Sequence, residues 1–131
     1  MKLDYTILII EDDRALSQVL GDKFRREGFV VFQASDGRTG LVKALEIKPA
    51  VIILDIVMPD MDGLTMLKKL RKNPWGKKVP VLMLSNLSDP EQLNEAQAHW
   101  AIDYIVKSSW SLDEIVKKVR AAAEHPEQNP D

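Results

Sequence analysis

The sequence of 131 residues contains no cysteine and 2 histidines. Without thiols there is no disulfide framework, no zinc site built on thiolates and no cysteine nucleophile. His99 and His125 are also too few for a multi-histidine metal site. The chain must therefore be stabilised by a hydrophobic core, and its chemistry must come from other side chains.

Long hydrophobic runs are missing as well. The uninterrupted apolar segments, such as Ile7–Ile10 and Val51–Leu54, are short, whereas a membrane-spanning helix needs about 20 apolar residues. Near the start, Lys2 and Asp4 carry charges where a secretory signal would have its apolar stretch. We therefore expect a cytoplasmic protein that does not engage a membrane.

An excess of positive charge is also missing. Lys and Arg number 18 and Asp and Glu number 20, which gives a net charge of −2. This balance argues against direct nucleic-acid binding, which favours a strongly basic surface. Hydrophobic residues make up 45% of the chain, and its length suits a single domain of about 100–200 residues. We expect a domain over residues 1–124 and a flexible tail over 125–131, a segment without apolar periodicity.

Short apolar runs alternate with segments whose apolar residues are spaced three or four apart. The runs are Thr6–Ile10, Phe29–Gln33, Val51–Leu54, Val79–Leu84 and Ile102–Val106. Such runs are typical of strands covered on both faces, and the spaced segments are typical of amphipathic helices. Strands that are each followed by a helix favour a parallel sheet with helices on both faces, which is an α/β fold.

Local signals mark the ends of the predicted helices. Gly28 can close the first helix, and Pro49 stops the second. Asp89 followed by Pro90 predicts the start of the fourth helix. Ser111, three residues before Glu114, has the spacing of a capping box and predicts the start of the fifth.

Acidic side chains stand where two of the predicted strands end. Glu11, Asp12 and Asp13 follow the first strand, and Asp55 ends the third. Carboxyl ends of parallel strands meet at one sheet edge, where ligands of such folds bind. Carboxylates gathered there would repel one another, and an all-oxygen site suits Mg²⁺. The alternative is that Asp12 or Asp13 merely caps the first helix.

Ser85 follows the fourth strand and Lys107 the fifth. Each alone is an ordinary residue, since serine often stands in turns and lysine is usually solvated. Together with the carboxylates they supply a nucleophile, metal ligands and donors for phosphoryl oxygens. No glycine-rich loop follows the first strand, so we expect no nucleotide site.

A basic run surrounds the sequence Asn73-Pro74-Trp75-Gly76. It comprises Lys68, Lys69, Arg71, Lys72, Lys77 and Lys78. A docking site for nucleic acid or for an acidic partner is one interpretation. We favour solvated cations at the end of the third helix, where they interact well with the helix dipole.

These residues resemble the receiver domain of two-component response regulators. The likeness rests on Ile7-Leu8-Ile9-Ile10-Glu11-Asp12-Asp13, Ile53-Leu54-Asp55 with Met58-Pro59 and Gly63, Leu84-Ser85, and Asp103-Tyr104-Ile105-Val106-Lys107. It covers residues 4 to 123. The resemblance implies a flavodoxin-like sheet of five parallel strands in the order 2-1-3-4-5, with five helices on both faces.

The resemblance also implies a role for each matching residue. Asp55 would be the phosphoacceptor, and Mg²⁺ would bind Asp12, Asp55 and the carbonyl of Val57. Glu11 would complete the acidic pocket. Ser85 and Lys107 would hold the phosphoryl oxygens, and Tyr104 would swing inward as the switch. Asp13 would lie outside this set.

Some positions depart from the family pattern. Ser108 follows Lys107 where proline is usual, and the stretch Ser108-Ser109-Trp110 is one residue longer than is common, with Trp110 in place of the usual aromatic residue. Trp100 precedes the fifth strand where glycine is common, and Asn86 stands where alanine or glycine is common. A cis peptide before serine would cost about 2.5–4 kcal/mol, so we expect a trans bond there. The apolar Val57 and Leu87 cannot orient an attacking water, which predicts slow self-dephosphorylation.

The sequence therefore predicts a phosphoaccepting receiver that catalyses only its own modification. The resemblance implies a sensor histidine kinase or phosphotransfer protein as donor, and a downstream protein or a second copy as output partner. A pseudo-receiver that is never phosphorylated is the alternative. A phosphohydrolase is disfavoured because Val57 occupies the position of its second carboxylate.

Overall fold

The fold is described from a computed structural model, in which residues 5–85, 90–99, 101, 103–106 and 111–124 are described. Several residues discussed above lie outside the described residues. They are Asn86, Leu87, Asp89, Trp100, Lys107, Ser108, Trp110 and the segment 125–131.

The sheet is parallel, with strands in the order β2-β1-β3-β4-β5. The strands are β1 (Thr6–Ile10), β2 (Val30–Ala34), β3 (Val51–Asp55), β4 (Val81–Ser85) and β5 (Asp103–Val106). The helices are α1 (Arg14–Arg26), α2 (Gly37–Ile47), α3 (Gly63–Lys72), the 3₁₀ turn η1 (Trp75–Lys77), α4 (Pro90–Ala98) and α5 (Leu112–Glu124). The predicted α/β fold with a parallel sheet is confirmed.

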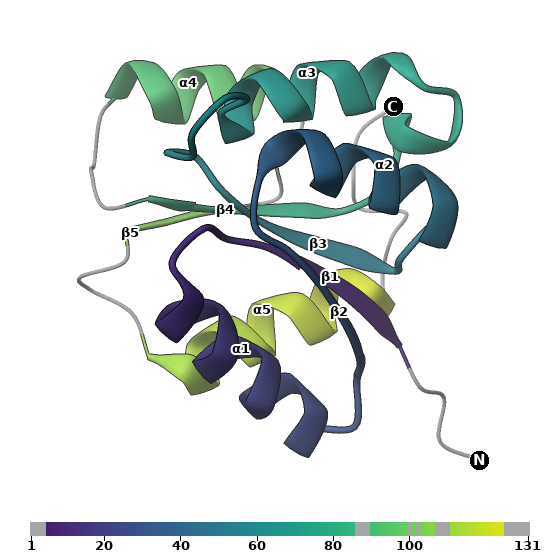
Figure 1. Ribbon diagram of the computed structural model, residues 1–131, viewed down its shortest axis with the longest axis vertical. Coiled ribbons are helices and arrows are strands. Elements are labelled where there is room, and N and C mark those ends of the chain that lie inside the picture. The colour runs from purple at the N-terminus through teal and green to yellow at the C-terminus, as the bar shows by residue number, and fades with distance from the viewer. Residues whose placement is uncertain (1–4, 86–89, 100, 102, 107–110, 125–131) are drawn as a thin grey trace.

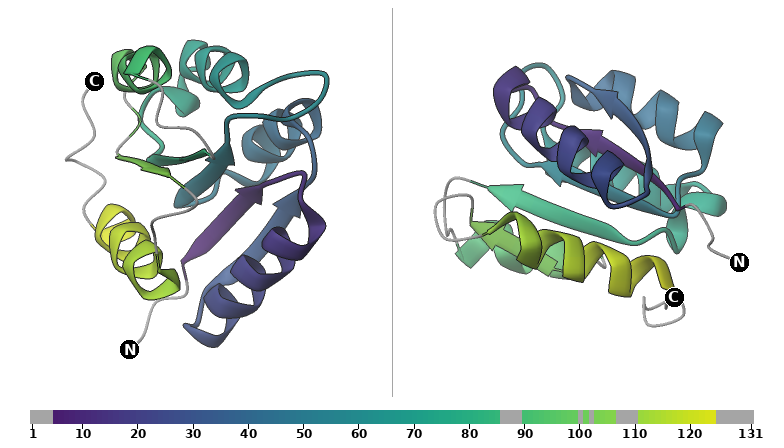
Figure 2. Two further views of the ribbon diagram at one scale, coloured as in Figure 1. Left: turned by 90° about the vertical axis from the view of Figure 1, so that its left-hand side faces the viewer. Right: turned by 90° about the horizontal axis from the view of Figure 1, so that it is seen from below.

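Helices cover both faces of the sheet, in three layers. Helices α2, α3 and α4 lie on one face, and α1 and α5 lie on the other (Figures 1 and 2). Every residue of β3 and β4 is buried between the layers. This burial explains why those strands read as continuous apolar runs in the sequence.

The two halves of the core differ in composition. The half under α2, α3 and α4 contains four methionines and is called the methionine side. They are Met58, Met61, Met66 and Met83. The half under α1 and α5 contains Phe24 and Phe29 and is called the phenylalanine side. The rings of these two residues pack edge to face, with their centroids 5.0 Å apart.

The helix starts follow the capping signals. Asp13, Asp36 and Asp62 are the N-caps of α1, α2 and α3, and each carboxylate accepts a backbone N–H from the first turn. Ser111 Oγ accepts from the N–H of Glu114, 3.2 Å away, at the start of α5. The predicted start of the fourth helix at Pro90 is also observed.

Two predicted strand starts were wrong by one or two residues. Strand β4 begins at Val81, although the apolar run begins at Val79. Pro80 separates the two and has no N–H to donate to a ladder, while the Val79 carbonyl accepts from Arg71. Likewise β2 begins at Val30, because the N–H of Phe29 bonds back to the Phe24 carbonyl.

Arg71 corrects the expectation of a solvated basic helix end. Its side chain is buried, with 8% of its surface exposed. It donates to the carbonyls of His99 (2.8 Å), Gly76 (2.8 Å) and Val79 (2.7 Å). Burial lowers the pKa of Arg71 to about 10, so the group is charged at neutral pH. Arg71 thus joins α3 to the end of α4 and to the segment that leads into β4.

On the phenylalanine side, ion pairs join α5 to α1 and to the residues that follow it. Lys23 on α1 lies 2.8 Å from Asp113 on α5. This pairing raises the pKa of Lys23 and lowers that of Asp113. Arg120 donates to the Glu27 carbonyl at 3.1 Å and lies 5.6 Å from the centre of the Phe29 ring. Helix α5 is therefore joined to this layer near its start at Asp113 and again at Arg120.

Strand β2 is one of the two edge strands of the sheet. The Val30 N–H and the Ala34 carbonyl bond toward β1, so the polar backbone groups of Val31 and Gln33 point outward. The Lys43 ammonium donates to the Gln33 carbonyl, and the Gln33 side chain bonds to Ser17. Side chains of α1 and α2 therefore cover this edge at Gln33.

Candidate phosphoryl and metal site

Three carboxylates meet at the carboxyl edge of the sheet. Glu11, Asp12 and Asp55 each offer an oxygen atom, and these atoms all lie within 4.8 Å of one another. Glu11 and Asp55 are 1% and 2% exposed, whereas Asp12 is exposed to solvent. The cluster is thus buried on its inner side and open on the side of Asp12.

The register of the strands explains why these residues meet. Ile10 on β1 is the partner of Leu54 on β3, so Glu11 and Asp55 occupy the next step on adjacent strands. The N–H of Glu11 bonds to the Ala34 carbonyl, 3.0 Å away, which holds the end of β1 against β2. The site is therefore positioned by the central strands of the sheet, which are its most buried elements.

Asp13 has a different role from its neighbours. Its carboxylate accepts the N–H of Leu16 as the cap of α1, 3.2 Å away. Its own N–H donates to a carboxylate oxygen of Glu11, at 3.0 Å. The capping alternative therefore holds for Asp13, while Asp12 belongs to the acidic cluster. The prediction that Asp13 lies outside the set of proposed metal ligands agrees with this geometry.

Ser85 ends the strand next to Asp55. Asp55 is the register partner of Leu84, so Ser85 lies one step further along β4. Ser85 is fully buried, and the N–H of Ile56 bonds to the Leu84 carbonyl at 3.0 Å. Tyr104 lies on β5 as the partner of Met83. The structure brings the backbone of these strands to one edge, while Lys107 lies outside the described residues.

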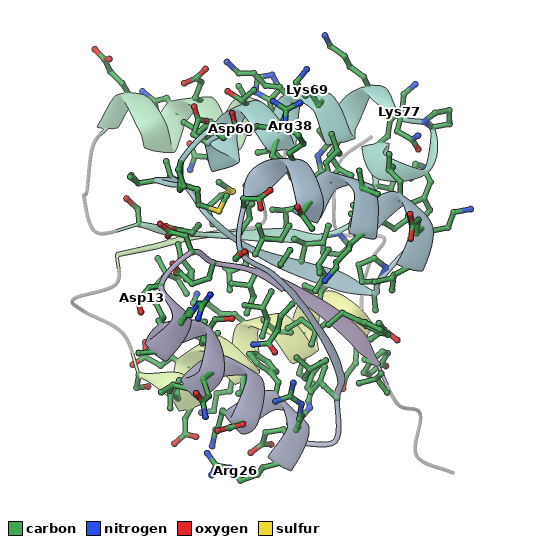
Figure 3. The ribbon with its side chains drawn as sticks, viewed as in Figure 1. Asp13, Arg26, Arg38, Asp60, Lys69 and Lys77 are labelled. Carbon is green, nitrogen blue, oxygen red and sulfur yellow. The ribbon has the colours of Figure 1, made fainter. Side chains whose placement is uncertain are left out.

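The loop between β3 and α3 follows directly after Asp55. The side chain of Val57, two residues after Asp55, is 55% exposed. Further along, Asp60 adopts a left-handed conformation with φ of 72°, and its carboxylate pairs with Arg38 on α2 at 3.2 Å (Figure 3). This ion pair fixes the outer end of the loop to α2.

Gly63 lets α3 begin close to the acidic cluster. A Cβ atom there would lie 2.1 Å from the carbonyl oxygen of Asp55, a distance that no side chain can adopt. The Gly63 N–H also bonds to the Ile56 carbonyl, 2.8 Å away. The close approach folds the loop back over the end of β3, which explains why glycine follows the capping Asp62.

The donor set fits a hard divalent cation. All three clustered side chains are carboxylates, and Mg²⁺ prefers oxygen ligands and usually keeps several waters. Bringing the three together in a partly buried place without a cation would cost electrostatic energy. The acidic cluster could therefore hold a metal ion, with its open side at Asp12 left for water or a ligand.

Comparison with known proteins identifies the family. A sequence profile of the response regulator receiver domain matches residues 7–120. The chain therefore belongs to the response regulator receiver family of two-component systems. Among the helices of the described residues, none combines the length and hydrophobicity needed to cross a bilayer.

Curated relatives are similar over nearly the whole chain. The DNA-binding dual master transcriptional regulator RpaA of Synechocystis is 33% identical over 124 residues, which is 95% of this chain and 51% of that protein. The regulatory protein AtoC of Escherichia coli is 35% identical over 109 residues, which is 83% of this chain and 23% of that protein. The chain thus spans about half, or less, of these relatives.

Solved structures share the fold. The chemotaxis response regulator CheY4 of Vibrio cholerae matches with a TM-score of 0.83 and 29% identity, covering 91% of this chain and 98% of that one. The CheX-CheY-BeF3-Mg complex of Borrelia burgdorferi matches with a TM-score of 0.82 and 26% identity, covering 90% and 88%. The flavodoxin-like class of the fold rests on this likeness as well as on the sheet.

Sequence reasoning missed the buried position of Arg71. The signal was present, because Leu64, Leu67 and Arg71 are spaced three and four apart and share the buried stripe of α3. A cation on such a stripe must find acceptors in the core, and it finds three carbonyls. The ion pair between Arg38 and Asp60 had no signal in the sequence, since it joins two exposed residues on separate elements.

Proposed function

We propose that the chain is a phosphoaccepting receiver that takes a phosphoryl group onto Asp55. The observation that carries the proposal is the cluster of Glu11, Asp12 and Asp55 at the end of a fully buried strand, in a chain of the receiver family. The donor is the phosphohistidine of a sensor histidine kinase or of a phosphotransfer protein. The site is cytoplasmic, as the kinases of such systems present their phosphohistidine there.

The transfer is a displacement at phosphorus. An Asp55 carboxylate oxygen forms the new bond to phosphorus, and the bond between phosphorus and the donor imidazole nitrogen breaks. The bonding pair returns to the imidazole, which becomes neutral histidine after proton exchange with water. The Ser85 hydroxyl donates to one phosphoryl oxygen, and the Lys107 ammonium pairs with another.

Asp12, Asp55 and the carbonyl of Val57 would hold Mg²⁺, and Glu11 would complete the acidic pocket. When bound, Mg²⁺ offsets the negative charge of the carboxylates and of the phosphoryl oxygens. The hard oxygen donors of the cluster support this assignment. So does the likeness to the CheX-CheY complex of Borrelia burgdorferi, which contains BeF3 and Mg²⁺.

The modification acts as a switch rather than as a step in turnover. Ser85 and Lys107 would be drawn toward the phosphoryl group, and Tyr104 would move inward and change the surface offered to a downstream protein or a second copy. The domain itself does not bind nucleic acid. The apolar side chain of Val57 stands beside the site and gives no orientation to an attacking water, so the phosphoryl group is lost slowly.

Intact-protein mass spectrometry with Mg²⁺ and acetyl phosphate tests the proposal. We expect one phosphoryl adduct that requires Mg²⁺ and disappears in Asp55→Asn. Asp60→Asn is the matched control, because Asp60 is an exposed carboxylate on the same loop that pairs with Arg38. It should be modified as the unaltered chain is. Asp12→Asn should raise the Mg²⁺ concentration needed for half-maximal labelling.

Each other outcome has a definite meaning. An adduct that survives Asp55→Asn would assign the phosphoacceptor elsewhere. No adduct from acetyl phosphate or from a phosphohistidine donor would favour the pseudo-receiver, a module that acts by binding alone.

A further inference from the structure

An apolar groove lies at the amino edge of the sheet, away from the acidic cluster. It has a volume of about 430 Å³ and is lined by residues that precede β3 and β4, by the η1 turn and by the end of α5. Its lining includes Pro49, Pro74, Trp75, Lys78, Pro80 and Ala123. Figure 3 places Lys77, next to this groove in sequence, far from Asp13 at the other edge of the sheet. The phosphoacceptor site therefore does not account for the groove.

The wall of the groove around Trp75 is held in shape by hydrogen bonds. The Asn73 side chain accepts the N–H groups of Trp75 and Gly76, at 2.9 and 3.3 Å. The buried Arg71 donates to the carbonyls of Gly76 and Val79 on either side of the turn. A groove formed by so constrained a backbone is ready for a ligand without reorganisation, which lowers the cost of binding.

The end of α5 brings a candidate occupant to this groove. Helix α5 ends at Glu124, and Ala123 is itself a lining residue. The next residues are His-Pro-Glu-Gln-Asn-Pro-Asp, over 125–131. We propose that this segment docks in the groove as an extended, polyproline-like strand. Seven residues in that conformation reach about 22 Å at about 3.1 Å per residue, enough to cross the groove from the end of α5.

The chemistry of the segment matches that of the groove. Pro126 and Pro130 supply rigid apolar rings, and proline-rich segments dock on aromatic-lined grooves because little entropy is lost. Trp75 offers such a surface and is half-buried. Glu127 and Asp131 are acidic, and the groove carries Lys78 with the exposed Lys77 beside it. The proposal thus differs from the flexible tail over 125–131 that the sequence composition predicts.

The lack of cysteine gives a direct test on the full chain. In Asn129→Cys a nitroxide attached to the single thiol broadens the NMR signals of nearby nuclei. We expect loss of the Ala50 and Val79 backbone amide signals, and their return when the nitroxide is reduced. Lys78→Glu should restore much of both signals by repelling the acidic segment. Trp75→Ala should do the same by removing the aromatic wall.

A tail that moves freely would also visit the end of α5, so the groove variants decide between the two cases. If Lys78→Glu and Trp75→Ala both leave the broadening unchanged while the fold is intact by NMR, the proposal is overturned. Lys78 is exposed, so its variant provides the answer even if Trp75→Ala fails to fold.

A mixing experiment distinguishes docking within one chain from docking between two chains. Spin-labelled chain without isotope is mixed with ¹⁵N-labelled chain that has no cysteine. Loss of the Ala50 signal in that mixture would show that a second copy fills the groove, and would overturn the intramolecular proposal. The expected pattern should be the same in Asp55→Asn, because docking does not depend on the proposed phosphorylation.

Discussion

The hydrophobic cores on the two faces of the sheet are built from different side chains. The phenylalanine side packs Phe24 against Phe29 at a fixed edge-to-face angle, and ion pairs join α5 to α1. The methionine side contains unbranched thioether side chains, among them Met58 and Met61 in the loop that follows Asp55. Methionine adapts to irregular gaps, whereas rings packed edge to face and helices joined by ion pairs adapt less. The proposed switch needs a firm base and a side that can repack near Asp55, and the two sides of the core differ in this way.

The largest effect on stability is expected at two neighbouring residues of β4 whose side chains face opposite sides of the sheet. Leu82 belongs to the phenylalanine side and Met83 to the methionine side, and both are fully buried. Replacing either by alanine should lower the free energy of unfolding by about 2–5 kcal/mol. We expect the larger loss for Leu82→Ala, because the flexible methionine side collapses further into a cavity. Urea denaturation of the two variants checks this, and a larger loss for Met83→Ala would contradict the difference between the sides.

The variant Arg71→Met tests whether Arg71 holds α4 in place on the methionine side. The change leaves the carbonyls of His99, Gly76 and Val79 without their charged donor, and should cost about 2–3 kcal/mol of stability. Amide hydrogen exchange should accelerate most at the end of α4. Arg71→Lys keeps the charge but lacks the planar fork, so it should recover only part of the loss. Equal stability of Arg71→Met and the unaltered chain would show that Arg71 does not hold α4 in place.

Asp36→Ala tests the cap of α2, also on the methionine side. The Asp36 carboxylate accepts the backbone N–H and the hydroxyl of Thr39, which lowers the pKa of Asp36 below its ordinary 3.8. The variant should lose about 1 kcal/mol at neutral pH. A lowered pKa stabilises the fold above pH 3.8, and this stabilisation is lost as the pH falls through the lowered pKa.

Stability curves of Asp36→Ala and the unaltered chain should therefore converge under acid. Asp36→Asn keeps a capping oxygen without the charge and serves as the control. At neutral pH the stability of Asp36→Asn should be closer to that of the unaltered chain than the stability of Asp36→Ala is. The difference in stability between Asp36→Asn and the unaltered chain should also shrink in acid. A gap for Asp36→Ala that stays constant across this pH range would contradict the assignment.

The smallest effect concerns the ion pair between Lys68 on α3 and Glu95 on α4. Both side chains are more than two-fifths exposed, so the pair should contribute less than about 1 kcal/mol. A double-mutant cycle with Lys68→Met and Glu95→Gln measures the coupling. It should fade at high salt, while the effect of Arg71→Met persists. A coupling larger than the loss in Arg71→Met would show that the surface pair is what holds α4.

The sequence predicted those features that depend on local pattern. Apolar runs located the strands, and acidic residues at their ends located Glu11, Asp12 and Asp55 at one edge. Exact starts failed where a single backbone bond decided them, as at Val79 and Phe29. Arg71 was misjudged because its acceptors come from segments distant in sequence. The assigned roles of Ser85, Lys107 and Tyr104 stay predictions, which phosphorylation experiments can test.

The contact between Lys43 and the edge of β2 has a consequence for behaviour at high concentration. An open strand edge with exposed Val30 and Phe32 is a template on which another chain could extend the sheet. The Lys43 ammonium occupies the outward carbonyl of Gln33, and its charge cannot be buried between two pairing strands at low cost. We therefore expect Lys43 to oppose the pairing of this edge with another chain. Its replacement by an apolar residue should lower the concentration at which the protein begins to form insoluble β-rich assemblies.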